Sequence, residues 1–117
     1  MKKILVADDE MSIRLLYSEE LKEEGYDVVT AANGKEALEI VGREPLDLVI
    51  LDIKMPEMSG IEVLRQIKEK FPDLPVLLSS AYSEYKQDFG TWASEEYLVK
   101  SSDLEDLKAA VRRHLKD

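Results

Sequence analysis

The chain has 117 residues, of which 44% are apolar and none is cysteine, which predicts a single domain over residues 1–117 with no disulfide, thiol chemistry or cysteine-ligated zinc. Its net charge of −9 argues against nucleic-acid binding by this domain, because Lys and Arg supply most of that affinity by neutralising phosphates. No apolar run approaches the ~18 residues that cross a bilayer, and the N-terminal run stops at Asp8-Asp9-Glu10, too early for a signal peptide, so we expect a cytoplasmic protein without membrane association.

The first half of the chain alternates predicted strands and helices. We expect strands at residues 2–7 and 27–31, and helices at residues 11–24 and 35–43. Gly25 is placed to end the first helix in a left-handed conformation, and Asn33 to cap the second. Apolar residues at helical spacing predict the inner faces of the two helices: Ile13, Leu16, Tyr17 and Leu21 in the first, and Ala37, Leu38 and Val41 in the second.

The second half begins with the most apolar stretch of the chain. Residues 48–51 are four apolar residues that run directly into Asp52 and predict a strand buried on both faces. Further strands are expected at residues 76–80 and 96–99. Helices are expected from the cap residue Ser59 to about Lys70, and after a capping box formed by Ser102 and Glu105. Their inner faces are predicted to be Ile61, Leu64, Ile67 and Phe71 in the former, and Leu104, Leu107, Val111 and Leu115 in the latter.

The segment from Ala81 to Glu95 predicts a helix that is short or irregular, because Gly90 interrupts it. Its aromatic residues, Tyr85, Phe89 and Trp92, fit local packing better than a partner-binding surface. Strands that alternate with helices predict an α/β domain with a parallel sheet covered by helices on both faces.

Polar residues follow four of the five predicted strands at the point where each ends. They are Asp8 and Asp9, Asp52, Ser80 and Lys100. Because the carboxyl ends of parallel strands meet at one edge of a sheet, we expect these side chains to surround one crevice.

Carboxylates so close together need a counter-charge. Two of them ~4 Å apart repel by about 4 kcal/mol at an effective dielectric near 20. A divalent cation removes this penalty, and ligands that are all oxygen favour Mg²⁺ or Mn²⁺. With the metal and Lys100 facing one carboxylate, Asp52 is the expected nucleophile for a phosphoryl group, forming an aspartyl phosphate.

The sequence resembles the receiver domain of bacterial two-component response regulators over its whole length. The resemblance rests on Asp8-Asp9, on Leu51-Asp52-Ile53-Lys54-Met55-Pro56 with Ser59-Gly60, on Ser80-Ala81, and on Tyr97 three residues before Lys100. Among receivers it is most similar to stand-alone ones, such as those of the sporulation phosphorelay and of chemotaxis. The resemblance implies a flavodoxin-like (βα)₅ fold with strand order 2-1-3-4-5.

The resemblance also implies roles for the residues. Asp52 takes a phosphoryl group from a phosphohistidine of a sensor histidine kinase or phosphotransfer protein. Asp9, Asp52 and the backbone carbonyl of Lys54 ligate Mg²⁺, and Asp8 positions it or reaches it through water. Lys100 pairs with the phosphoryl group. Ser80 and Tyr97 move on activation and change the face formed by the fourth helix, fifth strand and fifth helix, which a downstream protein reads.

Two departures from the family pattern stand out. Ser101 follows Lys100 where the family usually has a proline, which predicts a trans bond there. The stretch from Ala81 to Tyr97 is short and lacks the usual Gly-Ala. Lys54 and Tyr82 flank the expected path of a water that attacks the aspartyl phosphate, and their bulk predicts slow self-dephosphorylation.

Three other readings stay open on the sequence alone. An aspartate-nucleophile phosphatase would need a second Asp where Lys54 stands. A nucleotide-binding module would need a Gly-rich loop where Asp8-Asp9-Glu10 stands. A degenerate receiver would keep the fold and bind partners without phosphorylation. The one histidine, His114, is expected at the surface.

Overall fold

The computed structural model describes residues 1–81, 93–100 and 104–115. The elements in this part are β1 (Lys3–Ala7), α1 (Met11–Glu23), β2 (Asp27–Ala31), α2 (Gly34–Arg43), β3 (Leu48–Asp52), α3 (Gly60–Lys70), β4 (Val76–Ser80), β5 (Glu96–Val99) and α4 (Glu105–His114). The predicted fourth helix, with Tyr85, Phe89 and Trp92, falls on residues 82–92 and lies outside the described residues. The label α4 therefore denotes the last helix of the chain, which the sequence analysis counted as the fifth.

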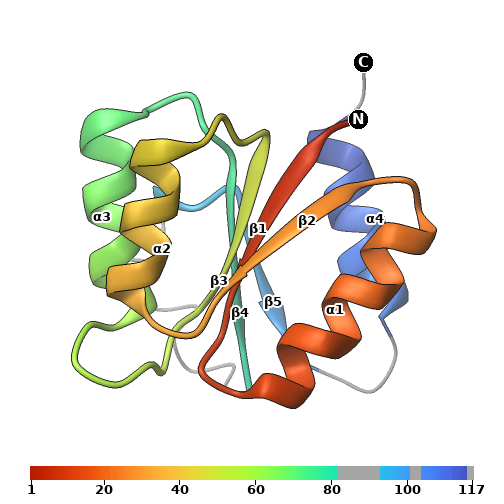
Figure 1. The fold of residues 1–117 in the computed structure, drawn as a ribbon, viewed down its shortest axis with the longest axis horizontal. Coiled ribbons are helices and arrows are strands. Elements are labelled where there is room, and N and C mark those ends of the chain that lie inside the picture. The colour runs from red at the N-terminus through yellow and green to blue at the C-terminus, as the bar shows by residue number, and fades with distance from the viewer. Residues whose placement is uncertain (82–92, 101–103, 116–117) are drawn as a thin grey trace.

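The five strands form one parallel sheet in the order β2-β1-β3-β4-β5, which confirms the fold and strand order expected from the sequence. The central strand β3 is buried throughout, as its apolar run predicts. All five strands end at the same edge of the sheet (Figure 1). Side chains that follow different strands are thereby brought together there.

The sheet separates two apolar layers, because alternate residues of a strand point to opposite faces. Helices α2 and α3 cover one face and α1 and α4 cover the other (Figure 1). Leu5, Val49 and Leu51 face the α2 and α3 layer. Ile4 and Ile50, their neighbours along β1 and β3, face the α1 and α4 layer.

Most helix ends follow their predicted signals. Gly25 has a φ of +95° after α1, which only glycine adopts readily. The side chains of Asn33 and Ser59 accept hydrogen bonds from the N–H groups of Glu36 and Glu62 at the starts of α2 and α3. The predicted capping box stays a prediction, because one of its two residues is outside the described part of the chain. Helix α4 begins after Leu104, whose side chain makes no capping hydrogen bond, and Ser102 lies outside the described residues.

Two predicted inner-face residues are exposed instead. Leu16 is 39% exposed, because the buried side of α1 is centred on Tyr17 and Leu21 and Leu16 falls at its margin. Phe71 is 41% exposed, because α3 ends at Lys70 and helical spacing no longer applies to the next residue. Two buried residues that the sequence analysis did not name, Ile40 and Val63, complete the α2 and α3 layer. The inner face of α4 is as predicted.

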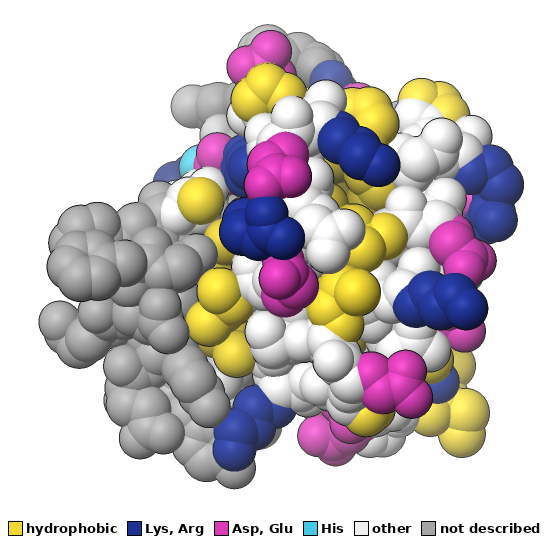
Figure 2. Space-filling model, turned by 90° about the vertical axis from the view of Figure 1, so that its left-hand side faces the viewer, with side chains coloured by type: hydrophobic (Ala, Val, Ile, Leu, Met, Phe, Trp, Pro, Cys, Tyr) yellow, Lys and Arg dark blue, Asp and Glu magenta, His cyan; other side chains and the backbone are white. Residues whose placement is uncertain are grey.

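The surface over α2 and α3 carries acidic and basic side chains next to one another, with apolar groups between them (Figure 2). The described residues of this face form no patch of a single charge. Within the described part of the chain, no helix combines the length and apolar character that a membrane span requires.

Candidate functional site

Backbone pairing places the predicted site residues at the carboxyl edge of the sheet. Asp52 and Ser80 are the last residues of β3 and β4. Asp8 directly follows β1, and its N–H donates to the carbonyl of Ala31 on β2. Lys100 directly follows β5, and its N–H donates to the carbonyl of Ser80 at 2.7 Å. The sheet itself therefore fixes where these side chains start.

Three carboxylates and one ammonium group meet at this edge. Carboxylate oxygens of Asp8, Asp9 and Asp52 all lie within 4.8 Å of one another. Asp8 and Asp52 are 2% and 5% exposed, whereas Asp9 faces solvent. Nζ of Lys100 lies 2.7 Å from Oδ2 of Asp8 and 3.3 Å from Oδ1 of Asp52. The ammonium group of Lys100 therefore offsets only part of the negative charge of the three carboxylates.

This environment changes the acidity of the nucleophile. Burial, and then the neighbouring charge of Asp8, raise the pKa of Asp52 to about 6, and they outweigh the opposing effect of Lys100. Burial alone would lower the pKa of Lys100, but its hydrogen bond to Asp8 and the charges of Asp52 and Asp8 raise that pKa above its ordinary value. At neutral pH Asp52 is therefore ionised, at an energetic cost.

The donor set fits a hard divalent cation. The cluster offers carboxylate oxygens, and in the described residues no histidine joins it. Oxygen ligands of this kind suit Mg²⁺, and a divalent cation would offset the excess negative charge of the cluster.

A cavity of about 250 Å³ opens over the cluster. Its lining consists of Asp9, Glu10, Asp52, Lys54, Ser80, Ala81 and Lys100. The buried Ser80 and the exposed Lys54 thus border the same cavity as the nucleophile. Glu10 also lines it, a residue that the sequence analysis did not assign to the site, although it directly follows Asp8-Asp9.

The predicted switch residue Tyr97 is not among the described residues that line this cavity. Tyr97 is half-buried on β5, packs against the core layer of α2 and α3, and borders a groove beside Asp106 of α4. Tyr82 and Ser101 lie outside the described residues. The predicted switch role of Tyr97 and the predicted rate-tuning role of Tyr82 therefore stay expectations.

Gly60 supports the end of β3 through its backbone. Its N–H donates to the carbonyl of Ile53 at 2.8 Å, which folds the loop after β3 back on the strand. A Cβ atom at position 60 would stand 2.0 Å from the carbonyl oxygen of Asp52. Only glycine fits there without moving the nucleophile.

The first turn of α1 holds Asp8 from a second direction. The Glu10 N–H donates to Oδ1 of Asp8 at 2.9 Å, and Nη1 of Arg14 donates to the Asp8 backbone carbonyl at 2.7 Å. The sequence analysis missed Arg14. Its place in the first turn of α1, six residues after Asp8, was the available signal, but no sequence motif marks a side chain that bonds to a backbone carbonyl.

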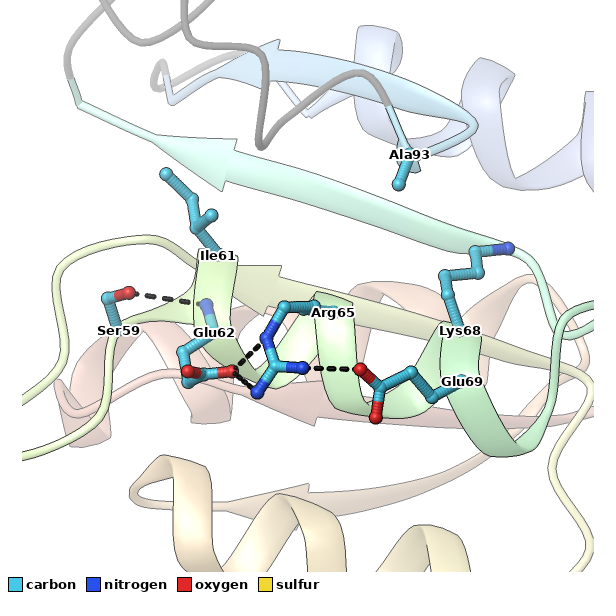
Figure 3. Close-up of a pocket in the computed structure, with 7 residues that line it drawn as sticks. All are labelled: Ser59, Ile61, Glu62, Arg65, Lys68, Glu69 and Ala93. Atoms are coloured by element: carbon cyan, nitrogen blue, oxygen red, sulfur yellow. Dashed lines mark hydrogen bonds and ion pairs between the residues drawn. The ribbon is translucent and has the colours of Figure 1, made fainter.

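A wider cavity, of about 550 Å³, lies along α3 away from the carboxylate cluster. Its charges are already neutralised within the protein (Figure 3). Arg65 bonds to both Glu62 and Glu69. Lys68 bonds to Glu95 at 2.9 Å. The charged side chains among its described lining residues are all paired, so the carboxyl edge of the sheet is the candidate site.

Comparison with known proteins identifies the family of the chain. The family model of the response regulator receiver domain matches residues 4–112. Sporulation initiation phosphotransferase F of Bacillus subtilis is 38% identical over 97% of this chain and 94% of its own. The alkaline phosphatase synthesis transcriptional regulatory protein PhoP of the same species is 37% identical, and the chain spans 49% of its length.

Solved structures give the same result. The response regulator protein TrrA from Thermotoga maritima, in complex with Mg²⁺-BeF, is 50% identical, and the match covers 98% of this chain and 100% of TrrA with a TM-score of 0.97. TrrA in complex with the histidine kinase ThkA matches with a TM-score of 0.94 over 99% of this chain and 100% of TrrA. With its parallel sheet, its carboxylate cluster and these relatives, the chain belongs to the response regulator receiver domains of two-component and phosphorelay signalling.

Proposed function

We propose that Asp52 accepts a phosphoryl group from a phosphohistidine on a sensor histidine kinase or phosphotransfer protein. An oxygen of the ionised Asp52 carboxylate attacks phosphorus, the bond from phosphorus to the histidine nitrogen breaks, and that nitrogen keeps the electron pair. The observation that carries this proposal is the approach of three carboxylates within 4.8 Å, with the Lys100 ammonium beside the nucleophile.

Mg²⁺ is the proposed cofactor, with Mn²⁺ as a substitute. Asp8, Asp9, Asp52 and the backbone carbonyl of Lys54 would hold it. When bound, it neutralises charge on the phosphoryl oxygens. The complex of TrrA with Mg²⁺-BeF supports this assignment.

The side chains of the cavity have distinct roles in the proposed reaction. Lys100 places a positive charge where the transferred group arrives. The Ser80 hydroxyl, which borders the same cavity, would donate a hydrogen bond to a phosphoryl oxygen. Lys54, exposed at the rim, would restrict the approach of water to the product together with Tyr82. We therefore propose that the protein catalyses its own phosphorylation and only slowly its own dephosphorylation.

The phosphodonor would dock over α1. On α1, the side chains of Met11 and Leu15 are 65% and 56% exposed. The helix begins directly after Glu10, which lines the cavity. Apolar side chains so exposed beside a reaction site favour a protein partner. The complex of TrrA with the histidine kinase ThkA supports a kinase as that partner.

The output is proposed to be a change in the face around β5, read by a downstream protein. Ser80 at the end of β4 pairs with Val99, two residues beyond Tyr97. A new hydrogen bond from Ser80 to the phosphoryl group would shift the population toward a packing in which Tyr97 turns inward.

Incubation with acetyl phosphate and Mg²⁺, followed by intact mass measurement, tests this function. The wild-type protein should gain one phosphoryl group, and Asp52→Asn should gain none. Asp73→Asn is the matched control, because the exposed Asp73 precedes β4 at the opposite edge of the sheet. If the wild type gains nothing, the phosphoacceptor role is wrong and a phosphorylation-independent interaction domain remains. If Asp52→Asn still gains the group, another residue accepts it and the role of Asp52 is wrong.

A further inference from the structure

Arg14 differs from the other arginines of the chain in what it contacts. The others are each paired with a glutamate: Arg43 with Glu44, Arg65 with Glu62 and Glu69, Arg112 with Glu24, and Arg113 with Glu96. Among the described residues, Arg14 has no carboxylate within salt-bridge distance. Instead, its side chain donates a 2.7 Å hydrogen bond to the backbone carbonyl of Asp8.

That carbonyl belongs to the turn that carries two of the three carboxylates. The Asp8 N–H is fixed by β2, and its side-chain oxygens are fixed by the Glu10 N–H and by Lys100. The bond from Arg14 fixes the fourth polar group of the residue, at the point where β1 gives way to the turn. Arg14 is half-buried on α1, so the bond is partly shielded from water.

We propose that Arg14 is a positioning residue for the metal site: by holding the Asp8 carbonyl, it keeps the Asp8 and Asp9 carboxylates in the arrangement that a divalent cation requires. This inference rests on the metal site of the proposed function. It assigns to α1 a part in metal binding in addition to presenting a surface to a partner.

The charge of Arg14 and its positioning role predict opposite changes in Mg²⁺ affinity when the side chain is removed. Arg14 is a cation near an acidic cluster, so removing its charge alone would strengthen Mg²⁺ binding. Removing a hydrogen bond that orders two ligands would weaken Mg²⁺ binding, by about fivefold for one net hydrogen bond. The direction of the change therefore separates the two effects.

A second contact of α1 supplies a matched control. The buried Tyr17 hydroxyl lies 3.3 Å from the hydroxyl of Ser79 on β4. Tyr17→Phe removes this tether between α1 and the sheet, but the tether does not involve the turn after β1. A general loosening of α1 would affect both variants, whereas loss of positioning would affect only Arg14.

The experiment is a calorimetric titration of the apo protein with Mg²⁺, with unfolding in EDTA as a check on the fold. Arg14→Met should bind Mg²⁺ about fivefold more weakly, Arg14→Lys should fall between it and the wild type, and Tyr17→Phe should match the wild type. At saturating Mg²⁺, phosphorylation of Arg14→Met by acetyl phosphate should recover to the wild-type rate.

Equal or tighter Mg²⁺ binding by Arg14→Met would overturn the proposal, and so would equal weakening in Tyr17→Phe. If the wild-type protein binds Mg²⁺ but gains no phosphoryl group, the proposed function is wrong. The titration still decides the role of Arg14 in that case. If the wild-type protein binds no Mg²⁺, both the proposed function and the role of Arg14 are wrong.

Discussion

The ammonium group of Lys100 donates a hydrogen bond to Oδ2 of Asp8 at 2.7 Å, across 92 positions of the sequence. It also lies near Asp52, so it occupies the same group of carboxylates that the proposed metal needs. Lys100 is therefore both the counter-ion of the metal-free site and a competitor of the metal.

Replacing Lys100 with Met should destabilise the protein in EDTA by about 3 kcal/mol, because it leaves two buried carboxylates without their partner. The same change should tighten Mg²⁺ binding, since the competing cation is gone. Denaturant unfolding with EDTA and a calorimetric Mg²⁺ titration measure the two effects. Lys3→Met is the control, because Lys3 pairs with Glu44 at the opposite edge of the sheet. Weaker Mg²⁺ binding in Lys100→Met would contradict the competition.

The pKa of Asp52 gives the site a specific pH dependence. It is raised from its ordinary 3.8 to about 6, so between these values the folded protein holds a proton that the unfolded chain has released. The metal-free protein therefore loses stability as pH rises from about 4 to 6, in total on the order of 3 kcal/mol.

Asp52→Asn removes this cost. In EDTA at pH 7.5 the variant should be more stable than the wild type by up to about 3 kcal/mol, and the difference should close toward pH 4. Denaturant unfolding across this pH range measures it. A constant difference between the two proteins would show that the ionisation of Asp52 is not its source.

Gly60→Ala should damage the site through the backbone. Its Cβ would stand 2.0 Å from the Asp52 carbonyl oxygen, so β3 or the loop must move. We expect a loss of about 2–3 kcal/mol in stability and at least a tenfold slower phosphorylation by acetyl phosphate. Gly42→Ala is the matched control, because a Cβ at that helical position meets nothing within 4 Å; it should stabilise α2 by about 0.5–1 kcal/mol. Equal behaviour of the two variants would refute the contact.

The phosphorylated protein should be long-lived. Lys54 borders the cavity, and Lys54→Ala should speed loss of the phosphoryl group several-fold by opening a path for water. Intact mass over time, after the donor is removed, follows the decay. The control Lys70→Ala changes an exposed lysine at the far end of α3. A wild-type half-life of seconds would be incompatible with this role.

The sequence predicted the strands and their polar ends because both signals are local. The apolar run before Asp52 identifies a buried strand, and parallel pairing then places Asp8, Ser80 and Lys100 beside it. The strand order itself came from the family resemblance, since local patterns do not say which strands are neighbours.

Tertiary contacts were harder to predict. Leu16 and Phe71 fit a helical stripe but are exposed, because the width of a buried face and the last turn of a helix depend on what packs against them. Arg14 and Gly60 act on backbone atoms of Asp8 and Asp52. Such contacts depend on the folded geometry of two segments, which residue spacing does not encode.

The Mg²⁺ dependence of phosphoryl transfer to Asp52 tests the central claim most directly. Wild-type protein with acetyl phosphate is followed by intact mass at increasing Mg²⁺, and the modified residue is located by peptide mapping. The account predicts a rate that is negligible in EDTA, rises to saturation with Mg²⁺ and places one phosphoryl group on Asp52. A rate that does not change with Mg²⁺, or a phosphoryl group on another residue, would contradict it.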